Sequence, residues 1–322
     1  MNEKFVLLKD DTRKFGDVEL YRIRALKEFE TMDGRLVEQG QLGGYVQSEQ
    51  NLSEDGKAWV ADFAYVFGNA VVKDDALVMD EALVSDDAVI KENAIIRDNA
   101  RVFGFAIVEG FAVASEWCRI GGRFIVSGHS EIYGKARIGG SGTGRIDSVA
   151  QIYGFANIYS AYHIGISGKA QIYDCAHIIG GCKICDSARV HGKVRISGNG
   201  ILIRDNAEVS GEAQILHSAY IGDEAFVSSI RANEVIIRDS SWICGNAHIV
   251  GKEDYRFVYF SREELTFFKN DEGHIIVSYL DNRGVREDMP MEIFVARHKR
   301  NKILTSEVHA AKIAMESGDK QH

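Results

Sequence analysis

Alanine recurs at every sixth position from Ala58 to Ala112, and Val or Ile follows two positions later in every hexad but the last. Residues six apart on an α-helix are rotated by roughly 240°, so the alanines would share no helical stripe. In a β-strand, residues i and i+2 point to the same side. The pattern therefore predicts short strands in which each alanine and the following Val or Ile face a common interior.

Residues that tolerate bends separate these short strands. Asp or Gly occupies the fourth position after most of the alanines, where the chain must turn a corner. These residues are Asp62, Gly68, Asp74, Asp80, Asp86, Asp98, Gly104 and Gly110. A strand and a bend in every six residues predict a parallel β-helix, with three hexads in each coil.

The hexads divide the chain into three predicted parts. Weaker repeats extend the pattern over residues 52–251, which gives about ten coils. Residues 1–51 are predicted to form a small N-terminal β capping segment. Residues 252–322 are predicted to form an α+β C-terminal cap, with a hairpin near Asn270–Gly273 and a helix from Met291 to near Ser317. Both end segments would cover strand edges that otherwise promote aggregation.

The hexads also carry a known consensus, [LIV]-x-[GD]-x-[AS]-x, as VKDDAL, VSDDAV, IRDNAR and VSGEAQ. In these segments the chain resembles the hexapeptide-repeat transferases, a family that folds as a left-handed β-helix. The left-handed winding is implied by this resemblance, because parallel crossovers are normally right-handed. The segment GQLGGYVQSEQNLS (40–53) is similar to the corresponding segment of YdcK-type transferases, a bacterial group within that family.

The resemblance implies acyl transfer. Family members move an acyl group from acetyl-CoA or another acyl-CoA to a hydroxyl or amine of a small molecule, with a histidine as general base. The segment DSSWICGNAHI (239–249) resembles the C-terminal coils of acetyltransferases, although Cys244 stands where glycine is usual. No catalytic histidine motif is recognisable, so a non-catalytic β-helix used for binding or assembly is the alternative interpretation.

Stacked coils would align outward side chains in rows, and one row is basic. It contains Arg101, Arg119, Arg137, Asn157, His177 and Arg195. Neighbours in a row lie ~4.8 Å apart, so like charges repel unless an anion or acidic groups lie alongside. We expect either an anion site that uses Arg119, Arg137 and Arg195, or a solvated face balanced by acidic corners.

A second predicted row contains Tyr133, Tyr153, Tyr173 and His191. The tyrosines could form a stabilising ladder of ring contacts, or a platform that binds a sugar or another planar ligand. His191 and His177 are the candidate catalytic bases, although a single histidine often has only a structural role.

Two further rows are apolar although they point outward. One contains Trp59, Leu77, Ile95 and Val113, and the other contains Val71, Val89, Ile107 and Ile125. Exposed apolar patches usually mark a covered surface. We therefore expect a terminal segment, a second subunit or both to lie here, and we favour a homo-oligomer.

Other chemistries have less support. No two histidines have the H-x4-H spacing of a related zinc enzyme, and the hexad register separates Cys182 from Cys185, so we expect no metal. The loop GGSGTGR (139–145) lacks the lysine and the following helix of a phosphate-binding P-loop.

Charge and composition limit the classes of partner and the cellular location that we expect for the protein. A net charge of −9 predicts no nucleic-acid binding. No apolar run reaches the ~20 residues that cross a membrane, and the charged start does not resemble a signal peptide. Five cysteines without paired spacing predict a reducing, cytoplasmic location.

Overall fold

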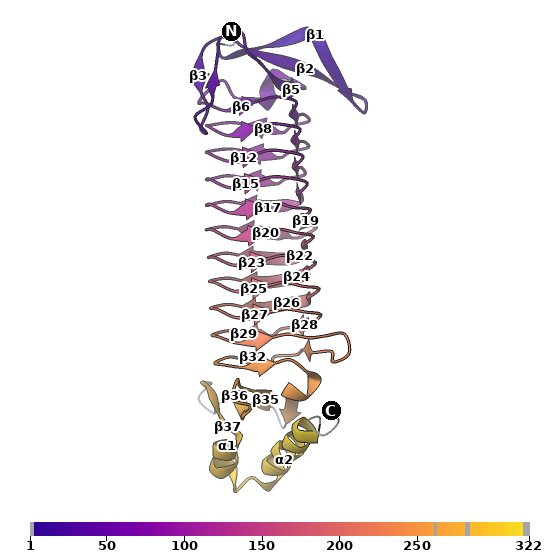
Figure 1. Cartoon of the computed structure of the whole chain (residues 1–322), viewed down its shortest axis with the longest axis vertical. Helices are drawn as coiled ribbons and strands as arrows, with labels where there is room; N and C mark the ends of the chain where they lie inside the picture. The colour runs from indigo at the N-terminus through magenta and orange to yellow at the C-terminus, as the bar shows by residue number, and fades with distance from the viewer. Residues whose placement is uncertain (1–2, 261–262, 281–283, 318–322) are drawn as a thin grey trace. The chain divides into compact units, whose positions relative to one another are not determined.

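The computed structural model describes residues 3–260, 263–280 and 284–317 of the 322-residue chain. It contains two compact units, Met1–Asp174 and Cys175–His322. Both are built mainly from parallel β-helix coils, which confirms the predicted fold class (Figure 1). Each coil contributes one strand to the set that runs from β6 to β33. The two units together hold 11 such strands, one more than the ten coils predicted from the sequence.

Unit 1 begins with strands that precede the regular coils. They are β1 (Phe5–Phe15), β2 (Val18–Ala25), β3 (Phe29–Glu30), β4 (Leu36–Val37) and β5 (Leu42–Val46), followed by the 3₁₀ helix η1 (Glu49–Asn51). β1, β2 and β5 pair in antiparallel order, whereas β5 also pairs in parallel with the first coil strand of its face. The N-terminal segment is thus continuous with the β-helix.

The coils of unit 1 have three faces, which we name after their first coil strand. The β6 face contains β6 (Trp59–Val60), β9 (Leu77–Val78), β12 (Ile95–Ile96), β15 (Val113–Ala114), β18 (Glu131–Ile132), β21 (Gln151–Ile152) and β23 (Gln171–Ile172). The β7 face contains β7 (Tyr65–Val66), β10 (Leu83–Val84), β13 (Arg101–Val102), β16 (Arg119–Ile120), β19 (Arg137–Gly140) and the start of β22 (Asn157–Ile166). The β8 face contains β8 (Val71–Val72), β11 (Val89–Ile90), β14 (Ile107–Val108), β17 (Arg123–Val126), β20 (Thr143–Ile146) and the end of β22.

Unit 2 continues with the same kind of coil. One face contains the starts of β24 (His177–Ile184) and β26 (Arg195–Ile203), then β28 (Gln214–His217) and β31 (Ile236–Ile237). The ends of β24 and β26 lie on the next face with β29 (Tyr220–Ile221) and β32 (Trp242–Ile243). The third face contains β25 (Arg189–Val190), β27 (Glu208–Val209), β30 (Phe226–Val227) and β33 (His248–Ile249).

The interior of the coils follows the sequence pattern. Every alanine of the regular stretch from Ala58 to Ala112 is 0% exposed, and so are the Val and Ile residues two positions later. A small residue at one position and a branched residue at the other fill the narrow interior of each coil.

The corners explain the recurrent acidic residues. Asp62, Asp80 and Asp98 all have positive φ, in the left-handed region that Asp enters more easily than most residues. Their carboxylates accept hydrogen bonds from the backbone N–H of the residue 18 positions later, as from Asp98 to Asp80 at 3.0 Å. Each corner carboxylate therefore satisfies a backbone donor of the next coil.

An antiparallel sheet and two helices complete unit 2. After the 3₁₀ helix η2 (Lys252–Asp254), the sheet contains β34 (Tyr255–Phe260), β35 (Glu263–Lys269), β36 (Ile275–Leu280) and β37 (Arg286–Pro290). The helices α1 (Met291–His298) and α2 (Lys302–Ser317) pack against it around buried residues such as Phe267 and Phe294. The backbone N–H of Trp242 donates to Thr266 Oγ1 at 3.0 Å, so the sheet lies against the last coil, as predicted for a cap.

The single helix predicted from Met291 to near Ser317 is wrong in one respect, because the chain breaks it after His298. Asn301 directly precedes the second helix. Its side-chain Oδ1 accepts from the Leu304 N–H at 3.1 Å, and its carbonyl accepts from the Thr305 N–H. Asn is a favoured N-cap residue, and this local hydrogen bonding competes with continuation of the first helix.

In the described ranges no helix has the length and apolar character needed to cross a membrane.

Candidate functional site

The predicted basic row exists within each unit. In unit 1, backbone pairing aligns Arg101 with Arg119, Arg119 with Arg137, and Arg137 with Asn157. The three arginines are exposed, and their guanidinium groups form no ion pair or hydrogen bond with any residue that the structure describes. In unit 2, His177 aligns with Arg195. Insertions between the hexads thus leave the row intact.

The tyrosine row of unit 1 is a tight stack. The rings of Tyr133 and Tyr153 lie 4.8 Å apart, those of Tyr153 and Tyr173 lie 4.9 Å apart, and both pairs are parallel within 1°. Each ring therefore covers the face of its neighbour and presents its edge to solvent. A planar ligand could stack only at an end of this ladder, so the geometry favours the stabilising interpretation over the binding platform.

An amide ladder runs beside the tyrosines on the β6 face. Gln171 Nε2 donates to Gln151 Oε1, and Gln151 Nε2 donates to Glu131 Oε2, both at 2.8 Å. Burial raises the pKa of the Tyr133 and Tyr153 phenols, so both remain protonated at neutral pH. Neither of these two phenols is therefore an ionised nucleophile at neutral pH.

His191, the first candidate base, is held by a carboxylate in unit 2. Its Nε2 lies 3.1 Å from Glu208 Oε1, and Glu208 also pairs with Arg189. A carboxylate can orient an imidazole for base catalysis. However, His191 lines none of the pockets described below.

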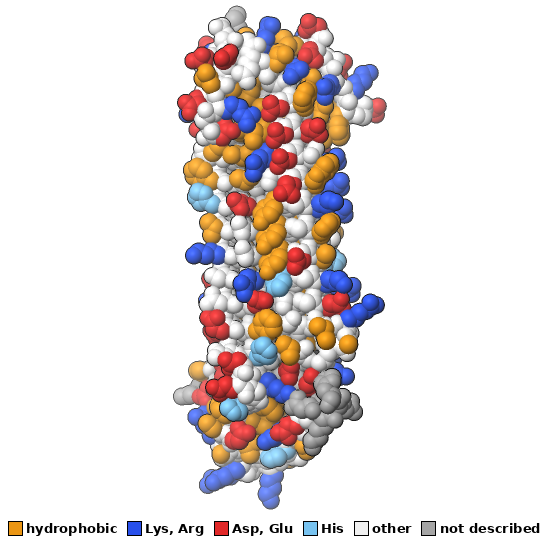
Figure 2. Space-filling view, in the orientation of Figure 1, with side chains coloured by type: hydrophobic (Ala, Val, Ile, Leu, Met, Phe, Trp, Pro, Cys, Tyr) orange, Lys and Arg blue, Asp and Glu red, His pale blue; other side chains and the backbone are white. Residues whose placement is uncertain are grey.

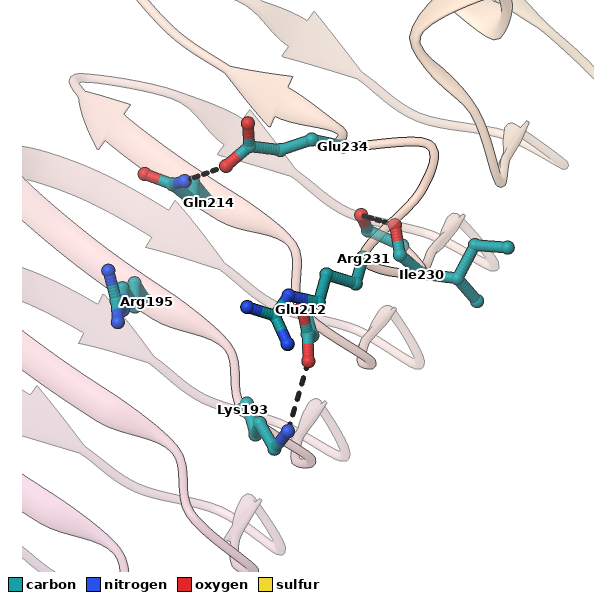
Figure 3. A pocket seen from close by; sticks show the side chains of 8 residues that line it. Lys193, Arg195, Glu212, Gln214, Ile230, Arg231 and Glu234 are labelled. Atoms are coloured by element: carbon teal, nitrogen blue, oxygen red, sulfur yellow. Dashed lines mark hydrogen bonds and ion pairs between the residues drawn. The ribbon is translucent and has the colours of Figure 1, made fainter.

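Arg195 lines a pocket that the sequence did not predict, and His177 lies next to it. This pocket in unit 2 has a volume of about 490 Å³ (Figure 3). It lies at the edge of the face that starts with β24, where the coil corners meet the loop of residues 228–234. Its lining residues are Lys193, Arg195, Glu212, Gln214, Ser229, Ile230, Arg231 and Glu234.

The pocket has two cations without partners. Lys193 Nζ is paired with Glu212 Oε1 at 3.0 Å, and Gln214 donates to Glu234. Among the described residues, Arg195 and Arg231 make no ion pair and no hydrogen bond through their guanidinium groups, as Figure 3 shows for the pocket itself. Two free guanidiniums beside a paired lysine favour a phosphate or carboxylate group.

His177 lies one strand away from this pocket. It is half-buried, and its ring has no hydrogen-bond partner among the described residues. Because His177 and Arg195 are directly opposite on neighbouring strands, their backbones lie ~4.8 Å apart. An anion held by Arg195 would therefore place its attached groups within reach of the imidazole.

The segment that resembles acetyltransferase coils has a different environment. The Cys244 thiol donates to Asp288 Oδ2 at 3.0 Å, and burial raises its pKa, so the thiol is not activated. The Trp242 ring stacks on Tyr220 at 3.7 Å and lies under the Arg286 guanidinium at 5.0 Å. These residues tie the last coil to the C-terminal sheet.

The sequence analysis did not identify three residues of this pocket as candidates, namely Lys193, Arg231 and Glu234. The feature of the sequence that could have indicated them is the break in the hexad period at 228–234, since an insertion in a β-helix must leave the coil as a loop.

The ranges that the structure covers offer no candidate metal site. In these ranges, no group of three or more His, Cys, Asp or Glu side chains could hold an ion.

Comparison with known proteins adds no family assignment, because no protein-family model and no curated protein matches the chain.

Proposed function

We propose that the chain is an acyltransferase that binds an acyl-CoA through the pocket of Lys193, Arg195 and Arg231. The observation that carries the proposal is the pair of unpartnered guanidiniums, Arg195 and Arg231, in a pocket of about 490 Å³. The resemblance of the hexads to hexapeptide-repeat transferases supports acyl-CoA as the anionic ligand. The acceptor is a hydroxyl or an amine of a small molecule.

In this proposal, His177 is the general base. Its ring is free to accept a proton from the acceptor, whose oxygen or nitrogen would bond to the acyl carbonyl carbon while arginine holds the phosphates. The C–S bond would then break, and the CoA thiolate would leave and take the proton back from the imidazolium. His191 has a different role, since Glu208 already holds its Nε2. We propose that His191 stabilises the coil surface.

Isothermal titration calorimetry with CoA and acetyl-CoA tests the proposal. We expect micromolar binding that weakens at least tenfold in Arg195→Gln and in Arg231→Gln. Lys183→Gln is the matched control, because Lys183 is an exposed cation on the same strand as His177 but on another face. Absence of binding at millimolar CoA, or equal affinity in the arginine variants, would refute the proposal.

A second candidate function is assembly through unit 1. Val71, Val89, Ile107 and Ile125 form an outward apolar row on the β8 face, each aligned with the next. Phe105 and Phe111, next to this row at the corners, are 57% and 50% exposed. On the face of the molecule drawn in Figure 2, hydrophobic side chains, a class that here includes tyrosine, lie in a column among charged ones. The outward apolar row of the β8 face favours association with a second copy of the chain.

Light scattering across a range of protein concentrations distinguishes this second function. We expect an oligomer that dissociates in Val89→Glu, whereas Val113→Glu on the β6 face leaves it intact. A monomer at every concentration would rule out assembly through the β8 face.

A further inference from the structure

A separate pocket in unit 1 has a different composition, and it lies where the N-terminal strand β1 crosses the β7 face. Its volume is about 460 Å³. The outward side chains of three successive coil strands, Tyr65, Leu83 and Arg101, form its floor. The pocket therefore combines an aromatic ring, an aliphatic side chain and a cation along one row.

Two phenylalanines form apolar walls. Phe15 comes from β1 and packs on Phe67, with ring centres 5.1 Å apart, and Phe63 comes from the neighbouring corner. Both rings remain substantially exposed, at 41% and 45%. Apolar rings left open at the mouth of a pocket are suited to contact with a flat ligand.

Arg13 is fixed in position at the same pocket. Its Nη1 donates to the Tyr65 hydroxyl at 2.9 Å, and its guanidinium lies 5.0 Å from the centre of the Phe63 ring. A guanidinium that is held before a ligand arrives loses little side-chain entropy on binding. Its remaining N–H groups are available for a further acceptor.

The second cation, Arg101, forms no ion pair with any residue in the described part of the chain. The one carboxylate of the lining, Glu81, accepts a hydrogen bond from Asn99 Nδ2 at 2.9 Å and forms no ion pair with either arginine among the described residues. The pocket thus presents two guanidiniums whose charge the surrounding side chains do not neutralise. A carboxylate matches the planar fork of a guanidinium.

We infer that this pocket binds a small carboxylic acid with a flat apolar body, such as an arylalkyl carboxylate. The carboxylate is held by Arg101 with Arg13, and the apolar body lies over Leu83 between Phe15 and Phe63. The inference does not depend on the proposed acyl transfer, since it concerns other residues in the other unit.

Saturation-transfer NMR and titration with sodium phenylacetate test this site on the full chain. A ligand of this size in an open pocket is expected to bind with a Kd of roughly 1 mM. Acetate, which lacks the ring, and phenylacetamide, which lacks the charge, should each bind at least tenfold more weakly. Equal binding of phenylacetamide would overturn the inference, and so would the absence of phenylacetate binding at 10-fold above the expected Kd.

Variants locate the site. Arg101→Gln and Phe63→Ala should each weaken phenylacetate binding at least fivefold. Arg119→Gln is the matched control, because Arg119 has the same position one coil further along the row and does not line the pocket. Since Arg101 is exposed and makes no side-chain bond in the described structure, its replacement should leave the thermal unfolding midpoint unchanged. Unaltered binding in Arg101→Gln would overturn the assignment.

Discussion

The carboxylate of Asp80 accepts a hydrogen bond from the backbone N–H of Asp98, one coil away, at 3.0 Å. Asp80 itself has φ of 59°. The same residue therefore forms the corner of its own coil and binds the corner of the next coil through its carboxylate. Replacement by alanine would remove the bond and strain the backbone.

We expect Asp80→Ala to lower the free energy of unfolding by about 2 kcal/mol, from roughly 1 kcal/mol for each effect. Asp80→Gly keeps the backbone freedom and should lose only about half as much. Asp80→Asn keeps an acceptor oxygen and tolerates positive φ, so it is the control. Urea unfolding measures the stability of all three variants. Equal losses of stability in the alanine and glycine variants would contradict a separate contribution from backbone strain.

Lys4 makes the stability of unit 1 depend on pH. Burial lowers the pKa of Lys4 from 10.5 to about 8. The unfolded chain therefore binds more protons than the folded chain between these two values, and the contribution of Lys4 to stability rises with pH across that window. Below pH 8 the folded state must hold a charged, largely buried ammonium, with Asp55 and Gly56 carbonyls at 3.5 Å as its nearest acceptors.

We expect Lys4→Met to be more stable than the natural chain at pH 7, by on the order of 1 kcal/mol. The difference should shrink between pH 8 and pH 10.5, where the folded lysine is neutral while the unfolded lysine still holds a proton, and should level off at higher pH. Urea midpoints of both proteins at pH 7 and pH 10 measure it, and a less stable Lys4→Met at pH 7 would show that the carbonyl contacts outweigh the desolvation.

The tyrosine ladder should stabilise unit 1 most at its centre. Tyr153 has a ring on both sides, whereas Tyr133 has Tyr153 on one side only. We expect Tyr153→Ala to cost about 1 kcal/mol more than Tyr133→Ala. Tyr153→Phe keeps the ring and should be nearly neutral. Equal costs for the two alanine variants in chemical unfolding would argue against ring stacking as the source of stability.

The five cysteines should differ sharply in reactivity. Burial raises the pKa of Cys118 and of Cys182 to about 12, whereas Cys175 is exposed. Since the thiolate is the reactive form, Ellman's reagent at pH 8 should modify Cys175 alone in the native protein and every cysteine after unfolding. Cys175→Ser should abolish the native reaction, and rapid modification of a second thiol would contradict the burial.

The sequence predicted what depends on local repetition. Ala58 and Val60 are small and branched residues that fill the narrow coil interior, and Asp62 marks the corner because few residues accept its backbone conformation. Register followed from these positions, so the stacking of Tyr133 on Tyr153 was predictable. The orientation of the rings was not predictable, because it depends on how the side chains pack and not on their spacing in the sequence. The loop expected at 139–145 was wrong, because the structure places these residues mostly in β19 and in coil strand β20, where most of the glycines lie.

Contacts between distant segments were beyond the sequence pattern. Trp59 and Leu77 point outward and are nevertheless buried, and Phe29 of the N-terminal segment packs edge-on against Trp59 at 5.4 Å. The first two side chains of this predicted apolar row are therefore covered by other residues of the same chain. The pocket at Arg231 was missed for the same reason, since an irregular loop carries no period from which its position could be inferred.

The corner bonds of unit 1 also determine how such a chain can change in length. They join residues 18 positions apart, as Asp80 and Asp98 show. Removal of a single hexad would move every later residue to a different face and match each corner with the wrong neighbour. Removal or duplication of a whole coil would preserve all three faces and add or subtract one member of every row. Evolution and protein engineering can therefore lengthen each row of outward side chains by one residue at a time, if a whole coil is duplicated.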